Sequence, residues 1–187
     1  GDVYKRQVLN GDTAEEVWNK CNAVLQQEDM SARGMILKSN VTHLCTTDDP
    51  ADSLEWHKKI KADKSFNVQV LPAWRPEAAM KIADKGFATY VRRLAGAAEM
   101  DIGSYDDFKA AMIKRLEFFN QMGCRASDHS LDYAMYVPAT AAEIEDIFAS
   151  ALAGEDITYE EDLKFKTAFL LFIGREYKRL GWVMQLH

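Results

Sequence analysis

The sequence predicts an α/β fold, specifically a partial (β/α)8 barrel of about four parallel strands with crossover and inserted helices. Short β-branched, apolar segments alternate with segments of helical periodicity, which implies parallel strands joined by crossover helices. Two spacers between strands exceed 50 residues and leave room for inserted helices. Because a complete eight-stranded barrel needs roughly 250 residues, four strands in 187 residues correspond to about half of one, and we expect a truncated piece.

The first elements are a pair of helices and a strand. Apolar residues at helical intervals predict a helix over 13–27, and Ser31 is expected to cap a short second helix. The β-branched segment 41–46 is the first predicted strand, and the turn-forming Asp-Asp-Pro at 48–50 closes it.

A second helix and strand pair follows. We expect a helix over 52–60 and a strand over 67–71 that ends at Pro72. Pro76 suits the first turn of another helix, because the N–H that proline lacks would have no intrahelical partner there.

Capping residues and glycines delimit the remaining elements. Ser104 opens a helix that stops at Gly123, and a short strand over 124–128 comes next. The last elements are a helix over 141–153 closed by Gly154, a long helix opened by Thr158 and closed by Gly181, and a strand over 182–187.

Composition limits the classes of function. A hydrophobic content of 48% in 187 residues predicts one domain, over 8–187, and 1–7 are expected to be a non-native junction. A net charge of −6 argues against nucleic acid, whose phosphates need clustered basic side chains. No apolar run approaches the roughly 20 residues that span a bilayer, so no membrane partner is expected. The three cysteines lie far apart without C-x-x-C spacing, which favours a reducing, cytoplasmic setting.

Each predicted strand ends in residues that can do chemistry, at the edge where parallel α/β folds bind substrates. Asp48 and Asp49 could bind a metal or hydroxyl groups, although Thr-Asp-Asp-Pro is also good turn chemistry. Arg75, after Trp74, offers two parallel donors to a carboxylate, and stacking of a surface arginine on the indole is an equally good interpretation.

The two later strand ends carry acid and base groups. Asp128 joined to His129 combines a hydroxyl acceptor with a group that titrates near neutrality, and a helix cap beside a structural histidine is the alternative. His187 has apolar neighbours, so a buried structural histidine is its default interpretation. No role is assigned to His43 or His57.

Several ordered tracts resemble the uronate isomerase (glucuronate isomerase) family of the amidohydrolase superfamily. They are TTDDP at 46–50, VLPAWRP at 70–76, CRASDH at 124–129 and GWVMQLH at 181–187, together with EVWNKCN at 16–22 and SARG at 31–34. The resemblance runs from about residue 13 to 187. It implies a distorted (β/α)8 barrel of which this chain is an internal fragment, less than half of a family member.

The resemblance implies a ketol-isomerase of hexuronate catabolism that interconverts D-glucuronate with D-fructuronate and D-galacturonate with D-tagaturonate, by proton transfer between C1 and C2 through an enediol. Arg75 would hold substrate oxygens, and Asp128 and His187 would act as catalytic groups beside the reacting carbons. Asp48, Asp49 and His129 are further substrate-binding candidates. The preferred hexuronate is not indicated, and a homo-oligomer is expected for the full-length enzyme.

The same resemblance implies a divalent metal, zinc by preference, held by a His-x-His pair and a later Asp. The chain contains no His-x-His pair, so we assign no metal ligand and expect the isolated fragment to be inactive. Two alternatives stay open at this stage. They are another metal-dependent hydrolase of the superfamily and a non-catalytic α/β binding module.

Overall fold

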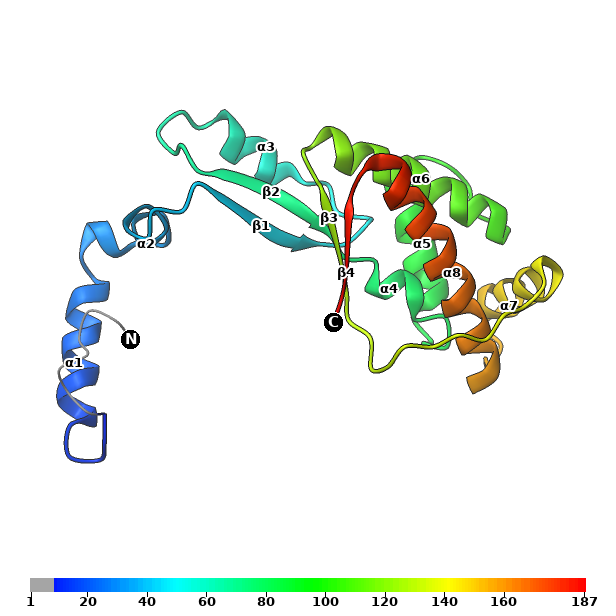
Figure 1. Cartoon of the computed structure of the whole chain (residues 1–187), viewed down its shortest axis with the longest axis horizontal. Helices are drawn as coiled ribbons and strands as arrows, with labels where there is room; N and C mark the ends of the chain where they lie inside the picture. The colour runs from blue at the N-terminus through cyan, green and yellow to red at the C-terminus, as the bar shows by residue number, and fades with distance from the viewer. Residues whose placement is uncertain (1–8) are drawn as a thin grey trace. The chain divides into compact units, whose positions relative to one another are not determined.

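The computed structural model describes residues 9–187, and their contacts divide the chain into two units (Figure 1). The first unit comprises Gly1–Leu44 and Asp63–Gln69, and the second comprises Cys45–Ala62 and Val70–His187. The predicted junction at 1–7 lies outside the described residues. The prediction of a single domain over 8–187 stays a prediction.

Polar contacts hold the first unit, whose described helices are α1 (Ala14–Leu25), η1 (Glu28–Met30) and α2 (Ala32–Lys38). Ser31 caps α2 as predicted, since its hydroxyl accepts a hydrogen bond from the Gly34 N–H at 3.2 Å. On α2, Arg33 pairs with Asp63 at 2.6 Å and lies 5.0 Å from the centre of the Phe66 ring. No residue of α1 is buried.

The sheet has four strands in the order in which they occur along the chain: β1 (His43–Asp48), β2 (Gln69–Trp74), β3 (Ala126–His129) and β4 (Val183–Leu186). The Gln69 N–H donates to Thr42 O and the Arg75 N–H to Asp48 O, a constant offset that makes β1 and β2 parallel. Both β2 with β3 and β3 with β4 are also parallel. The predicted α/β fold with four parallel strands is confirmed.

The predicted end of the second strand at Pro72 is wrong, because β2 continues to Trp74. The register pairs Trp74 with Ser127, and β3 begins only one residue before Ser127. Pro72 therefore lies where β3 has not yet begun, and no partner strand requires the N–H that proline lacks.

The helix predicted after Pro76 forms, but it is short. Helix α4 covers only Glu77–Met80. The carboxylate of Asp84 then accepts a hydrogen bond from the Gly86 N–H at 2.6 Å and stabilises a turn, after which α5 (Phe87–Ala98) starts a new helix.

The other helices are α3 (Glu55–Ala62), α6 (Tyr105–Gln121), α7 (Ala141–Ala153) and α8 (Tyr159–Leu180). Helix α3 begins three residues after the start of its predicted range 52–60, whereas the other three end within two residues of the predicted glycines. Thr158 and Glu161 form a capping box at the start of α8, and Gly181 ends that helix in the left-handed conformation. Within residues 9–187, every helix is too short or too polar to cross a membrane.

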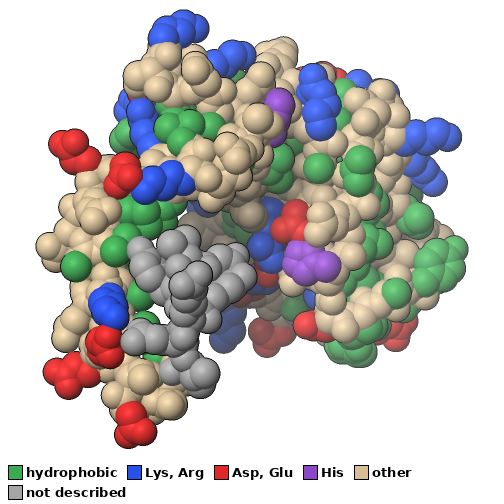
Figure 2. Space-filling model, turned by 60° about the vertical axis from the view of Figure 1, so that its left-hand side comes forward, with side chains coloured by type: hydrophobic (Ala, Val, Ile, Leu, Met, Phe, Trp, Pro, Cys, Tyr) green, Lys and Arg blue, Asp and Glu red, His purple; other side chains and the backbone are tan. Residues whose placement is uncertain are grey.

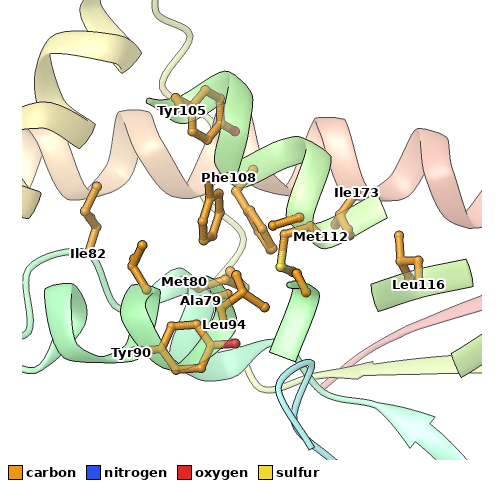
Figure 3. Close-up of a cluster of buried hydrophobic side chains, with 14 of the residues drawn as sticks. Ala79, Met80, Ile82, Tyr90, Leu94, Tyr105, Phe108, Met112, Leu116 and Ile173 are labelled. Atoms are coloured by element: carbon orange, nitrogen blue, oxygen red, sulfur yellow. The ribbon is translucent and has the colours of Figure 1, made fainter. Parts of the chain in front are cut away.

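The core of the second unit lies among α5, α6 and α8 (Figure 3). Leu94 from α5, Phe108 and Met112 from α6, and Ile173 from α8 are fully buried there. At the sheet side of this core, Trp74 is 0% exposed and packs edge-on against Phe119. The residue that precedes Arg75 is thus fixed by packing.

Candidate active site

Three of the predicted site residues meet at the C-terminal edge of the sheet. Arg75 directly follows β2, Asp128 lies near the end of β3, and His187 directly follows β4. Neighbouring parallel strands bring these residues together although more than 50 residues separate each from the next in the sequence. They form a row of a cation, an anion and a titratable ring, which we call the strand-end row.

The guanidinium of Arg75 lies between two carboxylates. Its Nη1 is 3.6 Å from Asp128 Oδ2, and its Nε is 3.2 Å from Glu77 Oε2. The Nε atom is buried, but neither carboxylate is aligned with it for a hydrogen bond. Since a guanidinium carries five N–H donors, Arg75 keeps donors available for a further anionic or polar group.

Asp128 links the two ends of the row. Its Oδ1 lies 2.7 Å from His187 Nδ1, yet the ring N–H is not aligned with it, and Oδ1 has no hydrogen-bond partner in the described part of the chain. The Asp128 side chain is 19% exposed and that of His187 is 49% exposed. A polyhydroxylated acid could therefore meet a cation, a carboxylate and an imidazole side by side.

Asp48 belongs to a different cluster. Its Oδ2 accepts a hydrogen bond from the Thr46 hydroxyl at 2.6 Å. The same hydroxyl is 2.7 Å from Nε2 of His57, a buried residue of α3. Thr46 and Asp48 are the half-buried positions of β1, whose burial alternates along the strand, so Asp48 faces α3.

Asp49 sits in the turn after β1. Its Oδ1 accepts a hydrogen bond from the Ala51 N–H at 2.9 Å, and its own N–H donates to Asp52 Oδ2. Arg93 Nη1 lies 3.8 Å from the same carboxylate. Burial raises the pKa of Asp49, against the opposing effects of the Ala51 N–H and of Arg93. Its contacts are those of the turn chemistry that the sequence offered as the alternative.

His129 faces away from the strand-end row. It is 2% exposed, and its Nε2 lies 3.0 Å from the hydroxyl of Tyr177 on α8. Burial lowers the pKa of His129 to about 4, although the nearby Asp128 carboxylate acts in the opposite direction. The ring is therefore neutral near pH 7.

A family model described as glucuronate isomerase matches residues 3–187. The chain belongs to the glucuronate isomerase family. Relatives named uronate isomerase include one from Lachnospira eligens, 53% identical over 180 residues, and one from Lachnoclostridium phytofermentans, 54% identical over 179 residues. Each match covers 96% of this chain and 38% of the relative, so the chain spans well under half the length of these curated relatives.

Solved structures of the family share the fold. The crystal structure of uronate isomerase from Thermotoga maritima matches with a TM-score of 0.86 at 33% identity, over 97% of this chain and 40% of that one. The glucuronate isomerase of Caulobacter crescentus matches with a TM-score of 0.86 at 26% identity, over 97% of this chain and 37% of that one. The fold of the chain is that of the corresponding part of these proteins.

Of the six predicted site residues in this glucuronate isomerase family member, the structure brings Arg75, Asp128 and His187 together. The contacts of Asp48, Asp49 and His129 lie elsewhere. The substrate-binding and catalytic roles of all six stay predictions.

The sequence interpretation missed two polar residues near these strand ends. His57, to which the sequence assigned no role, is buried on α3. Its position three residues before the apolar Ile60 is the signal that could have indicated the buried face of that helix. Tyr177 gave no comparable signal, because a tyrosine in an apolar helix stripe is typical of ordinary core packing.

The metal that the family resemblance implies has no matching ligand set in this part of the fold. Within residues 9–187, no group of three or more His, Cys, Asp and Glu side chains is arranged to hold a metal ion. The strand-end row supplies one carboxylate and one imidazole beside a guanidinium, and that cation opposes binding of a second cation. We therefore derive no chemical step through a metal in this segment.

The surface carries no single basic region on the face that Figure 2 shows. Lys and Arg side chains are scattered there among acidic and apolar ones.

Proposed function

We propose that this chain forms the substrate-recognition part of a uronate isomerase, which interconverts D-glucuronate with D-fructuronate and D-galacturonate with D-tagaturonate. Membership of the glucuronate isomerase family supports the reaction class. The observation that carries the proposal is the strand-end row, in which Arg75, Asp128 and His187 lie in contact along one sheet edge.

The isomerisation moves a proton between C1 and C2 of a hexuronate through an enediol. A substrate with a carboxylate and several hydroxyl groups needs a cation, hydrogen-bond acceptors and an acid/base group near the reacting carbons. In the proposal, Arg75 binds substrate oxygens through its unused donors. Asp128 accepts a hydrogen bond from a substrate hydroxyl through its carboxylate, and His187 is the acid/base group beside it.

The proposal assigns the divalent metal of the family, zinc by preference, to residues outside this chain. When bound, such a metal would polarise substrate oxygens. The side chains of the present segment would then orient the sugar against it. The cytoplasmic setting predicted from the cysteines and the expected homo-oligomer belong to the same proposal.

A chimera tests the proposal directly. The 180 residues that align with the L. eligens uronate isomerase replace the matching segment, which is 38% of that protein, and the purified product is assayed with D-glucuronate and D-galacturonate. Activity within about 10-fold of the parent supports the proposal. An inactive chimera that folds with a cooperative transition contradicts it.

Variants in the active chimera then test the strand-end row. We expect R75M to raise KM for both hexuronates, because one substrate-binding cation is lost. We expect D128N and H187N to lower kcat by about 100-fold or more, as is typical for a lost acid/base group. R92M serves as the control, because Arg92 lies exposed on α5 and donates a hydrogen bond to Thr89 of the same helix. Kinetics for R75M, D128N and H187N that match those of R92M would refute the assigned roles.

A further inference from the structure

A buried polar pair, His129 and Tyr177, lies behind the strand-end row on the opposite side of the sheet. Side chains alternate along a strand, so Ser127 and His129 point away from the face that carries Asp128. His129 contacts Tyr177, which is 1% exposed, through the 3.0 Å hydrogen bond between Nε2 and the phenol oxygen.

Tyr177 connects this pair to the strand that ends at His187. It lies on the last turns of α8, and Gly181 joins that helix directly to β4. Figure 1 shows α8 leading into β4, which runs beside β3. The Tyr177 ring also stacks on Trp182, with ring centres 5.9 Å apart and an angle of 14° between the planes. The hydrogen bond thus ties the end of β3 to the helix that precedes β4.

The backbone of His129 makes a second link to the same strand. The His187 N–H donates to His129 O at 2.9 Å, and the Leu131 N–H donates to His187 O at 2.8 Å. His129 is therefore bonded through its side chain to α8 and through its backbone to His187. Its neighbour Asp128 contacts the imidazole of His187.

Trp74, Ser127, His129 and Tyr177 form a buried cluster whose polar atoms lower the free energy of unfolding. His129 Nδ1, Ser127 Oγ and Trp74 Nε1 are buried without hydrogen-bond partners in the described part of the chain. Ser127 and Trp74 adjoin the phenol of Tyr177 and oppose the rise in its pKa that burial causes, but they are not aligned for hydrogen bonds. Buried unpaired polar atoms cost free energy, so an apolar cluster would give a more stable core. The cluster is better explained by a geometric role.

We propose that His129 and Tyr177 are positioning residues, whose hydrogen bond holds Asp128 and His187 at the separation that the reaction requires. This inference rests on the proposed isomerase function. It gives His129 a role behind the site, in place of the direct substrate contact that its motif suggests.

Kinetics of the active chimera test the positioning role. Because small misplacements of reacting groups cost up to about 100-fold in rate, we expect Y177F to lower kcat about 10-fold and H129A about 100-fold. KM should change by less than about threefold, since Arg75 is untouched. H129Q should recover most of kcat, because an amide can form the hydrogen bond with Tyr177 from a similar position.

The matched control is T167V on the same helix. Thr167 is 3% exposed, and its hydroxyl accepts one hydrogen bond, from the Val137 N–H at 3.0 Å. T167V and Y177F therefore each remove one buried hydroxyl from α8. A kcat for T167V within about twofold of the chimera supports the proposal. Equal losses in T167V and Y177F, or a kcat that Y177F and H129A leave unchanged, would overturn it.

Hydrogen exchange on the 187-residue chain provides a readout that does not depend on activity. Exchange at the Leu131 amide reports the bond to His187 O. We expect Y177F and H129A to speed this exchange about 10-fold or more, and T167V and H129Q to leave it near the unmodified value. If the chimera is inactive, the proposed function fails, and the exchange rates still decide the positioning role. Equal rates in Y177F and T167V would then refute it.

Discussion

The buried guanidinium of Arg115 on α6 allows a quantitative prediction about the turn after β1. Its Nε donates to Pro50 O at 2.7 Å, its Nη1 to Ala97 O at 3.0 Å and its Nη2 to Asp52 O at 2.7 Å. The side chain is 8% exposed and also lies over the ring of Phe118. Burial lowers the pKa of Arg115, but a guanidinium stays charged near neutral pH.

The expected loss follows from these three bonds. Each contributes roughly 1–2 kcal/mol net, so R115M should reduce the free energy of unfolding by about 3–6 kcal/mol. Methionine keeps the packing against Phe118, which separates the hydrogen bonds from the loss of contact area. R115K keeps the charge and has three N–H donors, but its compact ammonium lacks the planar fork that reaches three carbonyl oxygens at once. With one of the three bonds kept, it should lose about 2–4 kcal/mol.

Urea unfolding of the 187-residue chain, followed by far-ultraviolet circular dichroism, measures this loss. With a slope of about 2 kcal/mol per molar urea, the midpoint of R115M should fall by roughly 2 M. R92M at an exposed position of α5 is the control, and it should change stability by less than about 0.5 kcal/mol. A loss below about 1 kcal/mol for R115M would refute the view that Arg115 holds the turn.

Three further outcomes are expected. In urea unfolding, G123A should lower the free energy of unfolding by about 2–3 kcal/mol, whereas G154A should lower it by only about 1 kcal/mol. The angle φ is positive at both glycines, but of the two only Gly123 would place a new Cβ against a neighbour, Leu71 Cδ2 at 2.9 Å. Burial lowers the pKa of His129 to about 4, whereas the ordinary pKa of histidine is about 6.5. Between these two pH values the unfolded state binds a proton that the folded state does not bind. The free energy of unfolding should therefore fall by up to about 3 kcal/mol as the pH falls through that window. H129Q should flatten this dependence, and an equally steep fall in H129Q would contradict it. The 187-residue chain alone should show no turnover of D-glucuronate with zinc, and substantial turnover would exclude the assignment of the metal to residues outside the chain.

Local signals in the sequence predicted most of the elements, because capping and turn formation depend on neighbouring residues. The Ser31 cap and the capping box of α8 formed as expected, since a side-chain oxygen three residues from an amide needs no tertiary context. The end of β2 could not be predicted in this way. Whether Pro72 interrupts a strand depends on where β3 begins beside it, and that is a fact about the register.

The candidate site also has parts that the sequence could predict and parts that it could not. The rule that parallel strands end at one edge placed all six candidates at that edge, and the family resemblance selected Arg75, Asp128 and His187 among them. The structure places these three side by side. The same rule cannot say which face of the sheet a side chain takes. Asp48 and His129 have equally good motifs, but they point into the helical layer, toward His57 and Tyr177.

The sequence by itself thus determined the parallel α/β fold, the family and the edge of the sheet that carries the candidate site residues. These follow from periodicity, from local capping and from motif text. The tertiary structure alone decided which motif residues share one face, that Arg115 fastens the turn after β1, and that Tyr177 stands behind His129. Those facts depend on contacts between residues far apart in the chain, which no local pattern encodes.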